Sequence, residues 1–242
     1  MKKHIPNLFT SLNLLSGCIA SVMAFQGQYL WVVVWLIIAA IFDFFDGFMA
    51  RALKAYSAIG KELDSLADMV SFGFAPSVMV FTYLSGNISG LTPIASINPY
   101  IPYLAFLLTI FSALRLANFN IDERQTTTFI GLPTPANALF WISYIYGLHN
   151  SEWMTTGGLS SIFIYLTLLL IIVFSFLMIA EIPMFSLKAK SFGLKGNELR
   201  YLLIVFIIIA VILLKVLGIA AGILFYIGVS VLSSRKKDTS NR

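Results

Sequence analysis

Long apolar segments separated by short polar ones dominate the hydrophobic pattern of the chain. Inside lipid, backbone donors and acceptors must be satisfied within each segment, so these runs predict helices and not open sheets. Most runs are close to the roughly 20 residues that a helix needs to cross a bilayer. The expected membrane helices are 8–25, 29–50, 63–84, 101–116, 136–148 and 162–182.

The last apolar stretch, 201–232, is too long for one ordinary span. A single helix of roughly 32 residues would measure about 48 Å at a rise of about 1.5 Å per residue. Gly218 and Gly222 follow Lys215 in the middle of the stretch, which favours two short spans that form a hairpin. The expected organisation is a helical core at 1–199, a transmembrane hairpin at 200–234 and a basic tail at 235–242.

Composition supports a membrane location for the whole chain. Of 242 residues, 59% are hydrophobic, only 16 are Lys or Arg and 11 are Asp or Glu, and the mean hydropathy is +0.89. An ordinary soluble domain carries about a quarter of charged residues, so that class is excluded. The predicted fold class is all-α, a polytopic integral membrane bundle of about eight transmembrane helices. Cys18 is the single cysteine, which excludes an intramolecular disulfide and a cysteine metal cage.

The basic residues indicate the topology. Every Lys and Arg except Lys215 falls on one side of the predicted helices. The positive-inside rule then places both termini and the basic loops in the cytoplasm, and it favours eight spans over seven. We therefore read the net charge of +5 as a topology signal and not as a nucleic-acid-binding surface. The expected location is the cell (inner, cytoplasmic) membrane.

Four acidic residues lie where carboxylates are costly. Asp43 and Asp46 are at the cytoplasmic end of the second predicted span, and Asp64 and Asp68 are at the start of the third. An ionised carboxylate in a membrane helix costs several kcal/mol unless it is paired, hydrated or bound to metal, so such residues are functional candidates.

Helical spacing brings these four carboxylates onto two facing surfaces. Asp43 and Asp46 are three residues apart and Asp64 and Asp68 are four apart, so each pair shares one face of its helix. The short connection 52–59 makes the two helices antiparallel neighbours. Converging like charges would repel unless cations held them. An all-oxygen ligand set selects hard ions, which predicts Mg²⁺ or Mn²⁺.

Small residues accompany the acids on the same faces. Gly47, Ala50 and Gly60 leave room for the close approach of a nucleotide. Small residues also mediate ordinary helix packing in membranes, and the sequence alone leaves both uses open.

The acidic segment resembles the signature of the CDP-alcohol phosphotransferases, integral membrane enzymes of phospholipid synthesis. This resemblance implies transfer of the phosphatidyl group of CDP-diacylglycerol to an alcohol, with release of CMP and with two divalent ions held by aspartates. The matching pattern is Asp43-x2-Asp46-Gly47-x2-Ala50-Arg51-x8-Gly60-x3-Asp64-x3-Asp68.

The resemblance also implies roles for individual residues. The four aspartates would be metal ligands, and Asp68 would also be the general base. The Pro6-Asn7-Leu-Phe-Thr10 segment resembles the family's N-terminal nucleotide contact, although Asn7 could equally cap a helix. The expected contacts with CDP-diacylglycerol are Asn7, Thr10, Gly47, Ala50, Arg51, Ser57 and Gly60.

Later segments resemble the branch of the family that uses serine as the acceptor. These segments are Arg115-Leu-Ala-Asn118-Phe-Asn120, the stretch 129–136 and the stretch 183–188. The usual pattern has a second Arg where this chain has Asn118. Arg115 suits the carboxylate of serine, and the oxygens of Asn118 and Asn120 suit its ammonium group. The alternative is that Arg115 extends from a helix end to lipid phosphates.

The expected reaction is therefore phosphatidyl transfer from CDP-diacylglycerol to L-serine, giving phosphatidylserine and CMP. Other acceptors, such as glycerol 3-phosphate, inositol phosphate or choline, remain alternatives within the family. An ion or proton transporter is the alternative from another class, although it would place acids through the membrane midplane. The resemblance also allows a homodimer in the bilayer.

Overall fold

The structure of the protein is a computed structural model that describes residues 4–88, 97–122, 130–151, 159–184 and 197–240. In these ranges the chain is helical apart from turns and one isolated antiparallel bridge between Ile130 and Pro183, which confirms the all-α class. The helices are α1 (His4–Phe25), α2 (Tyr29–Ala52), α3 (Ala58–Asp68), the π-helical η1 (Met69–Phe74), α4 (Ala75–Asn87), the 3₁₀-helical η2 (Asn98–Phe106), α5 (Leu107–Ile121), α6 (Thr134–His149), α8 (Leu159–Ile179), α9 (Glu198–Leu214) and α10 (Leu217–Ser240).

Several helices have the length and composition of membrane spans, as the apolar pattern predicts. Five in the described part of the chain are long and apolar enough to cross a bilayer: His4–Phe25, Tyr29–Ala52, Ala58–Asn87, Asn98–Ile121 and Ser161–Ile179. The third is a continuous helix built from α3, η1 and α4. Helix α6, at 16 residues, is shorter than these. The total of eight spans stays a prediction.

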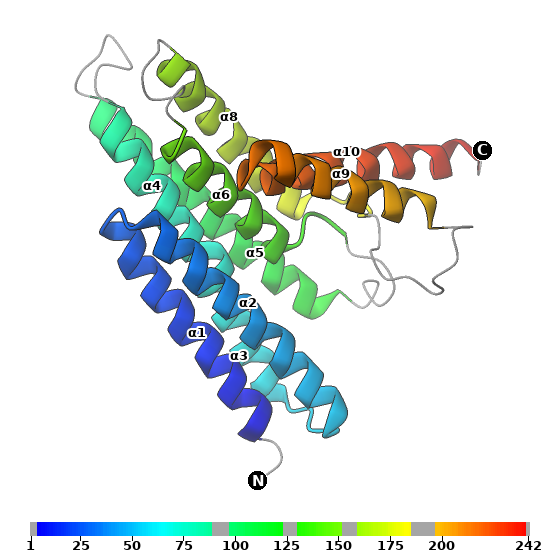
Figure 1. Cartoon of the computed structure of the whole chain (residues 1–242). Helices are drawn as coiled ribbons and strands as arrows, with labels where there is room; N and C mark the ends of the chain where they lie inside the picture. Colours follow the sequence, from blue (N-terminus) through cyan, green and yellow to red (C-terminus); the bar gives the residue numbers. More distant parts are fainter. Residues whose placement is uncertain (1–3, 89–96, 123–129, 152–158, 185–196, 241–242) are drawn as a thin grey trace.

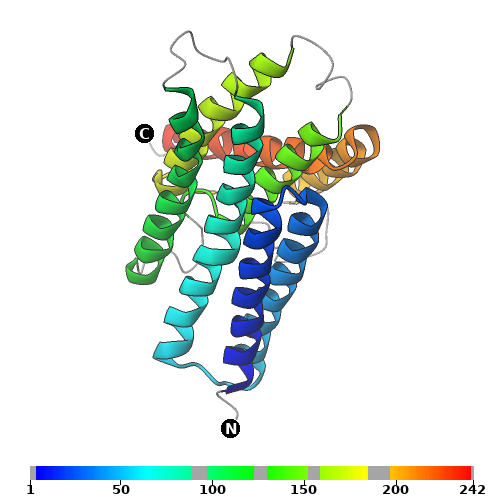
Figure 2. The ribbon, with the colours of Figure 1, turned by 90° about the vertical axis from the view of Figure 1, so that its left-hand side faces the viewer.

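The first helices form a tight antiparallel group. Gly27, with φ of +70°, allows the short turn between α1 and α2, because this backbone region suits glycine. Helix α1 also packs against α3, η1 and α4. Figure 2 shows these helices side by side, with the start of α1, the end of α2 and the start of α3 at the end of the molecule that carries the N-terminus.

The C-terminal apolar stretch forms two helices that pack against each other. Helix α9 ends at Leu214, Lys215 takes a φ of +53°, and α10 begins at Leu217. The tip of this hairpin packs against α6, where Leu217 lies over Gly147. In Figures 1 and 2 the hairpin lies across the direction of α1 and α2. Its two helices are as expected, while their crossing of the membrane stays a prediction.

Two glycine contacts bring neighbouring helices unusually close. A Cβ atom on Gly17 of α1 would lie 2.7 Å from the Cα of Ser71 in η1. A Cβ atom on Gly73 would lie 2.9 Å from the Cβ of Ser112 in α5. Both contacts fall in or beside the π-helical turn that directly follows Asp68, so small residues fix the position of this turn between α1 and α5.

The Gly17 contact predicts a loss of stability on substitution. Gly17→Ala places a methyl group against the backbone of η1, and we expect this overpacking to cost about 1–3 kcal/mol. Thermal unfolding in detergent should show a lower midpoint. Gly86→Ala is the matched control, because nothing lies within 4 Å of a Cβ at that position of α4. Equal midpoints for the two variants would contradict the close contact.

Candidate active site

Three carboxylates from two helices meet inside the bundle. Asp43 lies on α2, and Asp64 and Asp68 lie on α3. One oxygen from each lies within 4.8 Å of the others, and all three side chains are partly buried. The tight turn between α2 and α3 makes the helices antiparallel, so the facing acidic surfaces that the spacing predicts are brought together.

Asp46 lies beside this group without joining it. It is only 6% exposed, and with Asp64 it lines a neighbouring cavity. One carboxylate oxygen of Asp46 and one of Asp64 are buried and accept no hydrogen bond from the described residues. Unsatisfied carboxylate oxygens that crowd together in a low-dielectric site must either take up protons or bind cations. The donor set therefore fits hard divalent ions such as Mg²⁺ or Mn²⁺, with Asp43, Asp64 and Asp68 as the central ligands and Asp46 at the side.

A cavity of about 810 Å³ opens next to the carboxylates. It is large enough for a nucleotide, because small-molecule pockets usually span roughly 300–1,000 Å³. Asp64 belongs both to the carboxylate group and to the cavity wall. The wall includes all seven residues that we expected to contact CDP-diacylglycerol: Asn7, Thr10, Gly47, Ala50, Arg51, Ser57 and Gly60.

Each small residue of the cavity wall has a different physical role. The Ser57 hydroxyl caps α3 by accepting the Gly60 N–H at 3.1 Å. A Cβ on Gly60 would lie 2.9 Å from this hydroxyl oxygen and 3.1 Å from Oδ1 of Asn7, so glycine lets α1 approach α3 here. Around Gly47 the nearest atom is a nitrogen of Arg51 at 4.0 Å, which leaves open space for a ligand.

Asn7 lies within α1, which already begins at His4. The alternative that Asn7 caps this helix is therefore wrong. The backbone carbonyl of Asn7 accepts the Ser11 hydroxyl at 2.8 Å. Thr10 is buried, and its hydroxyl donates to the carbonyl of Pro6 at 3.1 Å. Both side chains belong to the cavity wall.

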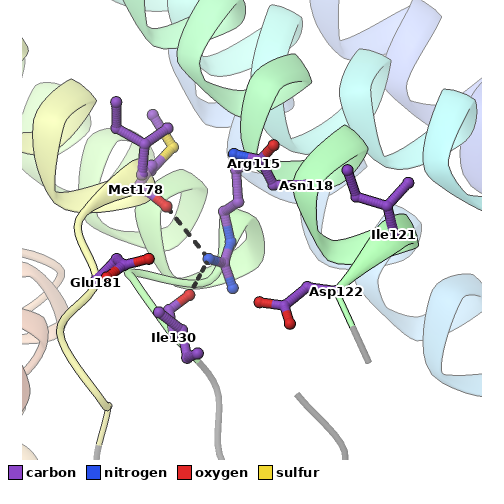
Figure 3. A pocket seen from close by; sticks show the side chains of 8 residues that line it. Arg115, Asn118, Ile121, Asp122, Ile130, Met178 and Glu181 are labelled. Carbon is purple, nitrogen blue, oxygen red and sulfur yellow. Dashed lines mark hydrogen bonds between the residues drawn. The ribbon is translucent and has the colours of Figure 1, made fainter. Parts of the chain in front are cut away.

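Arg115 is buried in the structure, with only 6% of its surface exposed. Its Nη1 donates to the carbonyl oxygens of Ile130 at 2.8 Å and Met178 at 3.3 Å (Figure 3). The alternative that Arg115 extends to lipid phosphates is therefore wrong. The guanidinium instead connects α5 to the segment before α6 and to the end of α8.

Arg115 lines a second cavity, of about 380 Å³. Asn118 and Asp122 reach it from the end of α5, and Glu181 reaches it from the segment after α8 (Figure 3). The cavity therefore contains one cationic and two anionic side chains together with an amide. This mixture of charges suits a small polar molecule that carries both signs.

Asn120 lies away from this second cavity, unlike the grouping that the sequence predicted. Its Nδ2 donates to the Ser65 hydroxyl of α3 at 2.9 Å, and its backbone carbonyl accepts from Nζ of Lys61 at 2.8 Å. Successive side chains of a helix point about 100° apart. Asn120 comes two residues after Asn118, so it points to a different side of α5 and contacts a different neighbour. Of the two other serine-branch segments, residues 129 and 185–188 fall outside the described residues.

Several residues at the site are not among those that the sequence singled out. Asp122 and Glu181 lie at helix ends, where a charged residue gives no distinct signal. Asn13 of α1 is fully buried and contacts Asp68 at 3.2 Å. Its place one turn after Thr10, as an amide in a membrane helix, could have indicated it.

The chain belongs to the CDP-alcohol phosphatidyltransferase family, whose family model matches residues 3–173. The matched range includes the carboxylate group, the nucleotide-sized cavity and Arg115. The resemblance seen in the aspartate pattern is thereby confirmed.

Individual proteins with assigned names are also similar to this chain. A Helicobacter pylori protein named CDP-diacylglycerol–serine O-phosphatidyltransferase is 32% identical over 193 residues, which cover 78% of this chain and 75% of the relative. A Bacillus subtilis protein of the same name is 35% identical over 133 residues, covering 54% and 70%. An archaetidylserine synthase of Methanothermobacter thermautotrophicus is 30% identical over 149 residues, covering 60% of each chain.

The carboxylate geometry predicts a binding defect that can be measured without turnover. We expect Asp43→Asn, Asp64→Asn and Asp68→Asn each to weaken Mn²⁺ binding at least about 10-fold, because each removes an anionic ligand. Electron paramagnetic resonance of free Mn²⁺ in a titration of the purified protein measures this affinity. Glu62→Gln is the control, since Glu62 is exposed on the same helix. Unchanged affinity in the three variants would contradict the metal site.

Proposed function

We propose that this enzyme transfers the phosphatidyl group of CDP-diacylglycerol to L-serine and releases CMP. One observation supports this most strongly: the cavity next to the carboxylates is lined by every residue that the family pattern assigns to the nucleotide. The name of the Helicobacter pylori relative supports serine as the acceptor.

The proposed reaction is a direct displacement at phosphorus. Asp68 accepts the proton of the seryl hydroxyl while the seryl oxygen attacks the β-phosphorus. The new P–O bond forms as the bond to CMP breaks. Arg51, on the cavity wall, lies where it can bind the phosphates. Divalent ions held by Asp43, Asp46, Asp64 and Asp68 would neutralise the diphosphate and the CMP leaving group. This scheme needs no nucleophile from the enzyme.

The cavity around Arg115 is the proposed serine site. The carbonyls of Ile130 and Met178 occupy Nη1 and hold the guanidinium in place, while Arg115 has further N–H groups that can bind a carboxylate. Asp122 and Glu181 can accept the ammonium group of serine, and Asn118 can accept or donate. Two anionic side chains would repel a phosphorylated acceptor, which favours serine over glycerol 3-phosphate or inositol phosphate.

We also propose that the site faces the cytoplasm from an inner membrane. Arg51 and Lys61 line the cavity itself, at the end of the bundle that carries the N-terminus. The positive-inside rule assigns this end to the cytoplasm. The proposal includes eight spans with both termini inside, with α9 and α10 as a separate hairpin and 235–242 as a basic tail. A homodimer stays a prediction.

Acceptor selectivity tests the proposed function directly. With CDP-diacylglycerol and Mn²⁺ or Mg²⁺, we expect CMP release to require L-serine and to stop when EDTA removes the ions. Glycerol 3-phosphate, inositol phosphate and choline serve as alternative acceptors in the same assay. Faster CMP release with any of these than with serine would overturn the serine assignment and leave the family chemistry intact.

Removal of the proposed base should separate binding from chemistry. We expect Asp68→Asn to lower kcat at least about 100-fold, since general base catalysis typically contributes about 10²–10⁴-fold. CDP-diacylglycerol binding, measured with labelled lipid in nanodiscs, should stay detectable. Glu62→Gln should keep both properties. Turnover of Asp68→Asn close to that of the unaltered enzyme would refute the assignment of Asp68 as base.

A further inference from the structure

We propose that Asn13 is a positioning residue, which holds the Asp68 carboxylate toward Asp43 and Asp64 and so determines the affinity of the carboxylate group for a divalent cation. The inference rests on the cation site of the proposed function, and it assigns a role to a residue outside the family pattern. Asn13 lies on α1, whereas α2 and α3 supply the four aspartates.

The contact between the two side chains is direct and buried. Nδ2 of Asn13 donates to Oδ1 of Asp68 at 3.2 Å, and Asn13 has no exposed surface. The orientation of the amide follows from chemistry, because the opposite orientation would set the amide oxygen against the lone pairs of the carboxylate. The amide oxygen itself accepts no hydrogen bond from the described residues. Burial of an amide with an unsatisfied oxygen costs free energy, so packing alone gives no reason for asparagine at this position.

The backbone of Asn13 is fixed on the same side. Its carbonyl accepts the Ser71 hydroxyl at 3.0 Å, and Ser71 lies in the π-helical turn that follows Asp68. Gly17, one turn further along α1, allows the close approach to Ser71. The side chain and the main chain of Asn13 thus bind two points on the helix that carries Asp68. Rotation or sliding of that helix against α1 would break both hydrogen bonds.

A single N–H donor has a specific effect on a carboxylate that binds a cation. It occupies one oxygen and fixes the plane of the group, so the other oxygen stays directed at the ion. Without it, Asp68 can rotate to reduce its repulsion from Asp43 and Asp64. Replacement of such a supporting partner typically costs about 10–100-fold in metal affinity or activity.

The test compares Mn²⁺ binding by Asn13→Leu and Thr167→Val, measured by electron paramagnetic resonance on the full chain. Leucine keeps a similar volume but has no donor. Thr167→Val is the matched control, because Thr167 is fully buried on α8 and its hydroxyl contacts the Tyr144 hydroxyl at 3.2 Å. We expect Mn²⁺ affinity to fall about 10–100-fold in Asn13→Leu and to stay unchanged in Thr167→Val. Steady-state kinetics should show a lower kcat at fixed Mn²⁺ with an unchanged KM for serine.

A fall of less than about 10-fold in Asn13→Leu would overturn the inference. Should Asn13→Leu unfold at a lower temperature than Thr167→Val, Asn13→Ala decides by the same measurement, because it removes the donor without adding bulk or a further carboxylate. Binding of Mn²⁺ requires no acceptor alcohol. Loss of Mn²⁺ affinity in Asn13→Leu therefore supports the inference even if serine fails to release CMP from the unaltered enzyme. Unchanged Mn²⁺ affinity in this variant, together with normal serine transfer, would refute the role of Asn13 and leave the proposed function intact.

Discussion

Holding the carboxylates of Asp43, Asp64 and Asp68 within 4.8 Å of one another inside a helical bundle costs free energy. Their mutual repulsion acts in a medium that screens charge poorly, and it would push α2 and α3 apart. Helix packing must therefore oppose this repulsion whenever the carboxylates are ionised and hold no cation. The placement of small residues at this end of the bundle, where Gly60 admits α1 and Gly17 admits η1, reflects that requirement.

Helix α1 helps to hold together α2 and α3, the two helices that carry the four aspartates. It packs against both α2 and α3, and it has polar side chains on the face that meets them. Asn7 and Thr10 lie along the cavity wall, and Asn13 contacts Asp68. A purely apolar α1 would pack as well but would offer no donors to a nucleotide or to a carboxylate. The polar side chains of α1 thus connect the wall of the nucleotide-sized cavity with the carboxylate group in one element.

Local periodicity explains which parts of this site the sequence could predict. The pairs Asp43/Asp46 and Asp64/Asp68 are one turn apart and are joined by a short connection, so helix geometry alone predicted their approach. The same reasoning could not show that Asp46 stands aside, because this depends on the rotation of α2 against α3. It also grouped Asn120 with Arg115, whereas Ser65 of α3 binds Asn120. Contacts between distant segments depend on tertiary packing, which local sequence patterns do not show. The same holds for the path of α9 and α10 across the bundle.

The end of α5 connects the two cavities, and this has a consequence for how acceptor and donor would meet. Phe119 lines the nucleotide-sized cavity, while Asn118 and Asp122 line the cavity of Arg115. Between them, Asn120 is bound to Ser65 and Lys61 of α3. The spacing of the two cavities is therefore set by hydrogen bonds between α5 and the helix that carries Asp64 and Asp68. Because direct displacement requires the attacking oxygen to lie close to phosphorus, a hydrogen-bonded connection between the proposed acceptor site and the carboxylates would supply orientation that apolar contacts alone would leave loose.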